Sequence, residues 1–315
     1  MDNTDLSIEI SEAKFEDIPD LVSCINTGVH FPPYWTASEL KWWFFEYPFP
    51  LILYRAIHKE ETVGTFAVFK RELTNNINCG VLMGLVIKNE WKGKGLFKML
   101  GEKAMKHFND IDLFVCFPNI IGAKALEKNF NFKTITRVET LILDENDINK
   151  KQAESFSIEK INSITTFKNY KKNQDKYLMF KNNEIFRDWR YRQNPHFSFY
   201  IITDQRKNFS IVKMFDDKDR GKKFGDIIDF EMEYVDKKSF FDLMIITCSA
   251  LNKFNIDAIT IKAIPNNLTY EVAKEIGFKE SNSNHYFCVK RKKPGIDIIN
   301  NPQNWIIRWG DFMRR

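Results

Sequence analysis

The stretch of this sequence that decides the fold is Leu85-Val86-Ile87-Lys88-Asn89-Glu90-Trp91-Lys92-Gly93-Lys94-Gly95-Leu96-Phe97. An apolar, strand-like run ends at Lys88, a loop with two glycines follows, and a helix is predicted from about Gly95. The first N–H groups of a helix have no partner within it, and they carry the positive end of its dipole. The segment therefore predicts a cradle for a phosphate or pyrophosphate group, and a plain surface turn is the alternative.

The spacing of this loop excludes two common phosphate-binding motifs. A Walker loop requires a glycine followed by Lys and then Ser or Thr, whereas Gly95 is followed by Leu96. A Rossmann loop would require a third glycine at position 98, which is Lys98. The glycines instead serve to bring the main chain close to an anion without interference from a Cβ atom.

Alternating and helical patterns define the elements on both sides of the loop. Strands are predicted at 8–10, 51–57, 63–70, 80–88 and 112–117, and helices at 15–27, 38–45, 95–108 and 122–129. An antiparallel hairpin comes first and a strand–helix–strand unit follows it. This order predicts a mixed α/β sheet with helices on both faces.

The second half of the chain repeats landmarks of the first half at a constant spacing. Three pairs of residues are each 147 positions apart: Trp42 and Trp189, Pro48 and Pro195, and Pro118 and Pro265. One shared period indicates a duplication rather than coincidence. The join is expected in the polar stretch 144–156, which gives a first domain at 1–148 and a second at 149–315 that includes an aromatic C-terminal tail.

The glycine loop resembles the acyl-CoA segment of the GNAT superfamily, whose pattern is V-x-P-x-[YW]-[RQ]-G-x-G-x-[GA]. The positions that fit this pattern are Ile87, Glu90, Trp91, Gly93, Lys94 and Gly95. Downstream, residues 118–132 resemble the family's N-x-x-A-x-x-L-Y-E-K-x-G-F segment, and the likeness in element order covers 8–143. The second half resembles the same fold without the glycine loop. The expected fold class is α/β (α+β), with two tandem GNAT-like mixed β-sheets flanked by helices.

The resemblance implies an N-acyltransferase that moves an acetyl or other acyl group from coenzyme A to an amine of a small molecule. Acetyl-CoA is the expected donor, an amino sugar or amino acid derivative is the expected acceptor, and no metal ion is expected. In this reading a main-chain N–H near Ile87 polarises the thioester, and Asn119 bonds the pantetheine arm. The residues expected to bind the donor are Val86, Ile87, Lys92, Gly93, Lys94, Gly95, Leu96, Phe97 and Asn119.

Several positions depart from the family pattern. Lys92 replaces Arg or Gln, and Phe97 replaces a small residue, which is expected to narrow the space beside the pyrophosphate. The Tyr that protonates the leaving thiolate in the family falls at Glu127 here. These departures favour an alternative function, a non-catalytic module that binds acyl-CoA or a partner. Transfer of an aminoacyl or long acyl group is a third possibility.

The general base and the acceptor pocket have only weak candidates. Asp229 and Glu231 alternate along a predicted strand and would share a face, where they bind an amine, act as a base, or are simply solvated. The catalytic candidates are Asp229, Glu231 and Glu127. The acceptor-pocket candidates, from an early aromatic loop and the C-terminal tail, are His30, Tyr34, Trp309 and Asp311. For both segments, packing without a binding role is the alternative.

Composition narrows the class of protein further. The 47 Lys and Arg residues are spread among 42 Asp and Glu residues, so no basic stripe for nucleic acid is expected. No run approaches the roughly 18 apolar residues of a membrane helix. The five cysteines form no C-x-x-C pair, which favours reduced thiols and a cytoplasmic location. The five histidines are scattered, which argues against zinc. The oligomeric state is not indicated.

Overall fold

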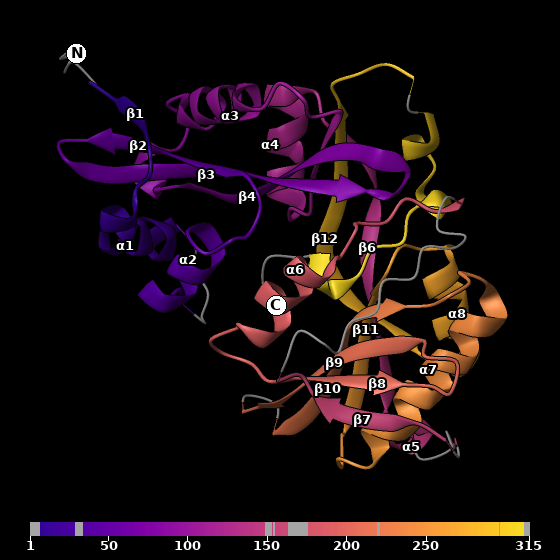
Figure 1. Cartoon of the computed structure of the whole chain (residues 1–315). Helices are drawn as coiled ribbons and strands as arrows, with labels where there is room; N and C mark the ends of the chain where they lie inside the picture. The colour runs from indigo at the N-terminus through magenta and orange to yellow at the C-terminus, as the bar shows by residue number, and fades with distance from the viewer. Residues whose placement is uncertain are drawn as a thin grey trace.

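The computed structural model describes residues 7–28, 34–148, 153, 155–162, 176–218, 221–295 and 297–311 (Figure 1). Its helices are α1 (Ile18–Gly28), α2 (Ala37–Phe44), α3 (Leu96–His107), α4 (Ile120–Phe130), α5 (Glu145–Ile148), α6 (Glu184–Arg187), α7 (Lys237–Asn252) and α8 (Leu268–Ile276). Its strands are β1 (Glu9–Glu12), β2 (Leu51–His58), β3 (Glu61–Leu73), β4 (Ile77–Ile87), β5 (Leu113–Cys116), β6 (Lys133–Asp144), β7 (Ser157–Lys160), β8 (Phe199–Thr203), β9 (Phe209–Asp217), β10 (Lys222–Glu231), β11 (Ala258–Ala263) and β12 (Lys279–Arg291).

Strand β4 separates two cores in the first half. Val81 packs in the cluster that contains Trp42 of α2, whereas the next residue, Leu82, packs in the cluster that contains Leu100 of α3. Successive side chains of a strand point to opposite faces. Helices α1 and α2 therefore cover one face of the sheet, and α3 and α4 cover the other (Figure 1). The predicted mixed α/β sheet with helices on both faces is confirmed.

The strands of both halves join into one continuous sheet. Its order is β1-β2-β3-β4-β5-β12-β6-β11-β10-β9-β8-β7. Only the β4–β5 and β10–β11 pairs are parallel, and the other neighbours are antiparallel. The GNAT-like strand arrangement of each half is present, but the two halves form one mixed sheet rather than the two separate sheets that were predicted.

Strands β6 and β12 are exchanged between the halves. The last strand of the second half, β12, lies beside β5 of the first half, with Cys288 opposite Cys116. In return β6 lies beside β11, with Leu141 opposite Ile261. Figure 1 shows both strands crossing the junction between the two halves. Each half therefore completes the sheet of the other.

The repeated tryptophans meet at this junction. The Nε1 group of Trp42 donates to the carbonyl of Trp189 at 3.1 Å, and the Nε1 group of Trp189 donates to the carbonyl of Trp42 at 3.1 Å. Their rings stack with centroids 4.8 Å apart. Two residues that exchange the same bond lie on a local two-fold axis. The 147-residue period thus corresponds to direct contact between equivalent positions.

In the second half, α7 and α8 cover one face of the sheet. Phe240 of α7 and Val272 of α8 pack with Ile259 of β11 in one buried cluster. On the other side, α6 continues into a π-helical turn, η6 (Asp188–Arg192), which carries Trp189. None of the helices in the described part of the chain is long and apolar enough to cross a membrane.

Candidate functional site

Strands β4 and β5 part near the middle of the first half. Their parallel ladder runs from Cys79 opposite Leu113 to Val81 opposite Val115. Strand β5 ends at Cys116, whereas β4 continues to Ile87. The part of β4 beyond Val81 therefore has β3 on one side and lacks a β5 partner on the other.

A β-bulge follows directly in β4. Thr65 lies opposite Val86 and Ala67 lies opposite Met83, so two β4 residues face one β3 residue between these pairs. Gly84, in the bulge, has φ +61°, which glycine adopts without strain. Its carbonyl accepts a 2.7 Å bond from Oγ1 of Thr65. A bulge bends its strand and redirects main-chain groups.

The bulge leaves two main-chain N–H groups directed toward the gap. The N–H of Lys88 donates to the carbonyl of Val63 in β3 at 3.0 Å. Because alternate N–H groups of a strand point toward opposite neighbours, those of Ile87 and Leu85 point away from β3, to the side that β5 has left. Donors in this position can bind a carbonyl oxygen placed between the strands.

The glycine loop after β4 is open at the surface. Lys92, Gly93, Lys94 and Gly95 are all exposed. Gly93 has φ +80° and Gly95 has φ +81°, and a Cβ atom on either residue would meet no atom within 4 Å. The glycines are thus required by the backbone conformation, and the space beside them is available to a ligand.

Helix α3 begins at this loop without a side-chain cap. Its N-cap residue is Gly95, and the N–H groups of Lys98 and Met99 are the first to bond back to the Gly95 carbonyl, at 3.1 Å each. The N–H groups of Leu96 and Phe97 precede this first intrahelical bond. An uncapped N-terminus on a 12-residue helix presents donors and a positive dipole end to an anion.

Two lysines flank the loop at its surface. Lys92 donates through Nζ to Oδ1 of Asn89 at 2.5 Å, and Nζ of Lys94 lies 4.4 Å from the ring centre of Trp91. Trp91 itself is buried, so it anchors the loop while the ammonium groups stay outside. These charges would attract an anion to the start of α3.

The ring of Phe97 lies away from the loop. It packs against Phe66 and Phe130, with centroids 5.7 Å and 5.4 Å away. Gly101, one turn further along α3, makes room for these rings, because a Cβ there would lie 2.2 Å from Phe130. The expectation that Phe97 narrows the space beside the pyrophosphate is therefore wrong, since the ring fills the core between α3 and α4.

Two predicted site residues, Asn119 and Glu127, belong to the α4 segment and make different hydrogen bonds. Asn119 is the N-cap of α4, and its Oδ1 accepts from the N–H of Gly122 at 2.8 Å. Its side-chain oxygen is committed to the helix, and only its amide group can serve a ligand. Glu127 is exposed on the same helix, and its carbonyl accepts from the N–H of Asn131, which has φ +55°.

The acidic candidates of β10 are bound to arginines. Asp229 is fully buried, with Oδ1 2.8 Å from Nη1 of Arg308 and Oδ2 3.5 Å from Nε of Arg187. Glu231 pairs with Arg187 as well. Burial tends to raise the pKa of Asp229, but Arg308 and Arg187 hold it below its ordinary value. The idea of a solvated strand face is wrong for Asp229, which is fully buried and paired with Arg308 and Arg187.

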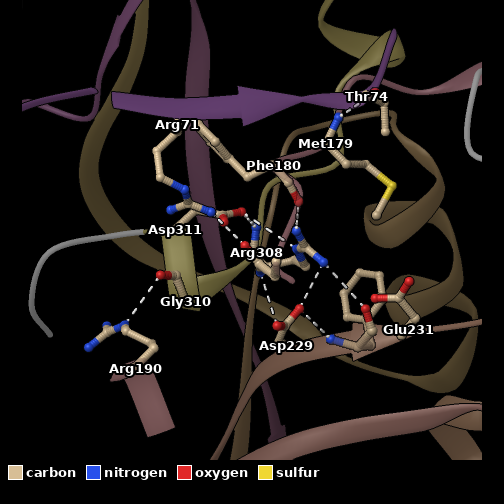
Figure 2. Close-up of polar contacts among 12 residues, drawn as sticks. Arg71, Thr74, Met179, Phe180, Arg190, Asp229, Glu231, Arg308, Gly310 and Asp311 are labelled. Carbon is tan, nitrogen blue, oxygen red and sulfur yellow. Dashed lines mark hydrogen bonds and ion pairs between the residues drawn. The ribbon is translucent and has the colours of Figure 1, made fainter. Parts of the chain in front are cut away.

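The C-terminal tail docks between the two halves. Trp305, Ile306 and Ile307 are fully buried, and the Arg308 guanidinium donates to the carbonyl of Phe180. Asp311, at the end of the described tail, is 1% exposed. Figure 2 shows Asp311 and Arg308 among the polar contacts of this region. The tail thus packs into the core where the two halves meet.

Of the other acceptor-pocket candidates, Tyr34 is the one whose side chain the structure describes. Tyr34 is 55% exposed. The side chain of Trp309 and the whole of His30 lie outside the described residues.

A small cavity lies where the tail meets β3 and β4. Its walls are Trp43, Tyr47, Phe69, Arg71, Val81, Met83, Phe186, Trp189, Gly310 and Asp311, and its empty volume, open mouth included, is about 230 Å³. Val81 and Met83 place it on the α1–α2 face of β4, where β5 departs. Both halves and the tail contribute walls, so the cavity exists only in the joined chain.

Asp311 is the unusual group in this cavity. Its Oδ2 accepts the N–H of Arg308 at 2.9 Å, but its buried Oδ1 has no hydrogen-bond partner among the described residues. Burial raises the pKa of Asp311, although Arg308 and Arg71 oppose the shift. An unsatisfied buried carboxylate oxygen is costly.

Sequence reasoning missed Arg71, the second charged wall of the cavity. Its side chain is 7% exposed, and its Nη2 donates to Oδ1 of Asn182 at 2.5 Å. The signal was present, because Arg71 alternates in phase with the buried residues Phe69 and Leu73 of one strand. A charged residue on the buried face of a strand indicates a polar site inside the fold.

Comparison with known proteins finds similarity in structure but not in sequence. No protein-family model matches the sequence, and no curated protein matches it significantly. The solved GCN5-related N-acetyltransferase from Anabaena variabilis has a TM-score of 0.65 at 13% identity, over 90% of this chain and 73% of that chain. Saccharomyces cerevisiae N-myristoyltransferase with bound myristoyl-CoA has a TM-score of 0.62 at 11% identity, over 91% and 84%.

A third match concerns the arrangement of the halves. A tandem GNAT protein from the clavulanic acid biosynthesis pathway has a TM-score of 0.58 at 10% identity. The match covers 92% of this chain and 100% of that chain. At such low identities the matches establish the fold alone. Two repeated halves, a parting β4–β5 pair and an open glycine loop before α3 agree with them, and this chain therefore has the fold of the GNAT superfamily.

Proposed function

We propose that this protein is an acyl-CoA-dependent N-acyltransferase that acylates an amine of a small molecule. The observation that carries the proposal is the uncapped N-terminus of α3, which opens beside two strands that have parted. A pyrophosphate fits the first feature, and the pantetheine arm of coenzyme A fits the second. Solved proteins of the same fold include N-acetyltransferases and an N-myristoyltransferase that binds myristoyl-CoA.

In this proposal the main chain holds the donor. The N–H groups from Gly93 to Phe97 would bind the pyrophosphate, with Lys92 and Lys94 supplying positive charge. The thioester would lie between β4 and β5, where the N–H groups of Leu85 and Ile87 polarise its carbonyl oxygen. Val86 lines the same segment of β4. Acetyl-CoA, the shortest acyl donor, is the first donor to test.

The acceptor would approach from the α1–α2 face. Helices α3 and α4 occupy the other face and flank the donor loop, whereas the small cavity beside the parted strands lies on the α1–α2 face. The amine nitrogen would attack the carbonyl carbon, the C–S bond would break, and coenzyme A would leave as its thiol. Phe97 packs away from the loop, which removes one reason for assigning a purely binding role.

Binding of acetyl-CoA by calorimetry tests the proposal. Gly95→Trp would fill the open cradle and is expected to abolish binding. The matched control is Gly295→Trp, because Gly295 also has positive φ, +89°, and open surroundings but lies after β12. The control carries the same backbone strain and is expected to bind normally.

A second readout separates binding from folding. At a ligand concentration of 100 times Kd, binding stabilises the native state by about 2.7 kcal/mol, so acetyl-CoA should raise the melting temperature of the wild type and of Gly295→Trp only. Equal binding by both tryptophan variants would show that the donor does not use this loop. Thiol release with a panel of amines then tests turnover.

A further inference from the structure

Eight exposed lysines lie on and beside helices α3 and α4, on what we call the α3–α4 face. Five belong to residues 92–106, in the glycine loop and α3, and three belong to residues 124–133, in and after α4. The same two segments contain two acidic residues, Glu102 and Glu127. Their net charge is therefore +6, whereas the whole chain carries +5. The excess positive charge of the molecule thus lies on this one face.

The lysines of the α3–α4 face are mostly not neutralised by carboxylates. Among the described residues, one of them forms an ion pair, Lys98 with Glu102 at 3.9 Å. Lys103 donates instead to the main-chain carbonyl of Ile10 in β1, at 2.6 Å. Like charges that lack counter-charges repel one another, and together they attract an anionic partner.

Exposed apolar side chains lie on the same face. Ile121 is 75% exposed and Ile120 is 44% exposed at the start of α4, and Met99 is 47% exposed on α3. Ile120 follows Cys116, the last residue of β5, by four positions, so the two isoleucines begin where β5 leaves β4. Exposed apolar side chains bordered by charged ones are typical of a surface that binds another molecule.

The basic face is longer than one molecule of coenzyme A requires. Six bonds join the inner phosphate of its pyrophosphate to its 3′-phosphate, and they reach at most about 9 Å. Lys106 lies ten residues after Leu96, the first residue of α3, which is about 15 Å along the helix. With a pyrophosphate at the start of α3, Lys106 is at the limit of that reach or beyond it. The face therefore fits a partner larger than a nucleotide.

The pantetheine arm of coenzyme A also occurs attached to protein. Acyl carrier proteins are small acidic proteins that hold an acyl group as a thioester on a phosphopantetheine arm. A phosphate at the start of α3 and an arm between β4 and β5 fit either donor. The protein-bound donor supplies, in addition, an acidic surface for the lysines and apolar contacts for Ile120 and Ile121.

A lipid surface would account for less of this arrangement. Membrane-binding faces also combine lysines with apolar side chains, but they have no need of a phosphate cradle beside a gap between strands. Here the cradle lies within the basic face, since Gly93 and Gly95 stand between Lys92 and Lys98. The surface charge and the donor loop are thus parts of one site.

We propose that the α3–α4 face docks an acidic acyl carrier protein, which serves as a second acyl donor. The acceptor nitrogen would bond to the acyl carbon, the C–S bond would break, and the carrier's arm would leave as its thiol with the proton lost by the amine. This transfer rests on the proposed acyltransferase function, whereas docking of the carrier does not.

Docking is tested with a carrier that lacks the arm. Calorimetry with the apo form of an acyl carrier protein of bacterial fatty acid synthesis should show binding that weakens about tenfold between about 50 mM and about 300 mM NaCl. Lys103→Glu combined with Lys106→Glu should weaken it about tenfold or more. The matched control, Lys238→Glu with Lys274→Glu, makes the same change of net charge on α7 and α8 and should bind normally. Absence of binding by the wild type would overturn the proposal.

The apolar part of the surface is tested separately. Ile121→Ser should weaken binding of the apo carrier about fivefold, because the carrier no longer covers an apolar side chain. Ile185→Ser, at a side chain 59% exposed on α6, is the control and should have no effect. Equal effects of the two serine variants would contradict the assigned surface.

Two other probes distinguish the carrier from anions in general. Binding of poly-L-glutamate should be unaffected by Ile121→Ser, since charge alone drives it. Vesicles of phosphatidylcholine and phosphatidylglycerol should not compete with the apo carrier. Binding of these vesicles without binding of the carrier would assign the face to a membrane and would overturn the proposal.

Turnover separates docking from the proposed function. With the acetylated carrier and a panel of amines, Lys103→Glu with Lys106→Glu should lower kcat/KM about tenfold, and kcat/KM with acetyl-CoA should change less than about threefold. Equal losses with both donors would show that these lysines serve coenzyme A, against the proposal. If neither donor releases its thiol, the acyltransferase function fails, and binding of the apo carrier still decides the docking surface.

Discussion

The two halves of the chain begin their central helices in opposite ways. Helix α3 has Gly95 as its N-cap and no side-chain cap. Helix α7, at the equivalent place in the second half, has Asp236 as its N-cap, whose Oδ1 accepts from the N–H of Ser239 at 2.8 Å. The N-terminus of α7 thus donates to a carboxylate of the chain itself, that of Asp236. Both helices have the same place in the fold, but only α3 has an N-terminus without a side-chain cap, where an external anion could bind.

The places where the parallel strands part, β4–β5 and β10–β11, also differ between the two halves. Strands β10 and β11 also part, after Ile227 opposite Ile261, and β10 also carries an irregularity before Asp229. The C-terminal tail contacts this part of β10 through Arg308, which lies 2.8 Å from Asp229 and donates to the Phe230 carbonyl at 3.4 Å. In the second half, residues of the chain itself therefore occupy the place where the two parallel strands part.

The largest effect is expected from removing the ion pair that holds the tail. Arg308→Met leaves Asp229 and Asp311 buried with less compensation, and loss of one partner of a buried ion pair costs about 3 to 5 kcal/mol. Urea unfolding followed by fluorescence would measure this change. Lys238→Met, which breaks a pair with Asp242 whose lysine side chain is 77% exposed, is the control and should cost under about 1 kcal/mol.

The double variant sharpens this prediction. Arg308→Met combined with Asp229→Asn should be less destabilised than the sum of the single changes, because the uncompensated charge is then absent. Strict additivity would mean that the tail is held by its apolar residues and not by the pair.

A second prediction concerns His285, whose equivalent position in the first half is Val138. His285 of β12 lies opposite Val138 of β6, and the two are 147 residues apart. Burial, assisted by Lys262, lowers the pKa of His285 from 6.5 to about 4. The unfolded chain therefore binds a proton that the folded chain refuses, so stability is present above about pH 6.5 and is lost as the pH falls toward 4.

The expected loss reaches at most about 3 kcal/mol, since one pKa unit corresponds to 1.36 kcal/mol and the ring is partly exposed. His285→Val restores the residue of the first half and should flatten the profile between pH 6.5 and 4. His107→Gln, at an exposed site, should leave the slope unchanged. Unfolding free energies measured across this range would decide, and identical slopes in the wild type and His285→Val would contradict the prediction.

The smallest effect comes from moving the α7 cap to α3. Gly95→Asp would place a carboxylate where Asp236 stands in the other half, and Asp tolerates positive φ better than most residues. We expect acetyl-CoA to bind about tenfold more weakly, through competition for the same donors and repulsion of phosphate. Gly95→Asn, with the same shape and no charge, should lose less. Equal affinities for Asp and Asn variants would argue against an anion site.

The sequence predicted the local elements of the first half well. The helix expected at 95–108 is observed at Leu96–His107, and the loop that precedes it has the positive φ angles that its glycines suggested. Such features depend on periodicity and on residues a few positions apart, which are visible in one sequence. The role of the loop in donor binding remains a proposal.

Long-range features were harder to foresee. Alternation in β6 and β12 is equally compatible with pairing inside a half or across the halves, so the exchange was not predictable. Solvation stayed among the alternatives for Asp229 because its partner Arg308 is 79 residues away in the sequence. The assignment of 1–148 and 149–315 as domains stays a prediction about the duplication, because the sheet runs through both.

The exchange of β6 and β12 has a consequence for motion. A hinge between the halves would have to separate β12 from both β5 and β6, and β6 from β11, and each separation would expose unpaired strand edges. The arrangement is similar to that of a domain-swapped homodimer, with both halves joined in one polypeptide. Entry and exit of small molecules must then rely on segments at the rim, and a protein cut near residue 148 should regain its structure only when both pieces are present together.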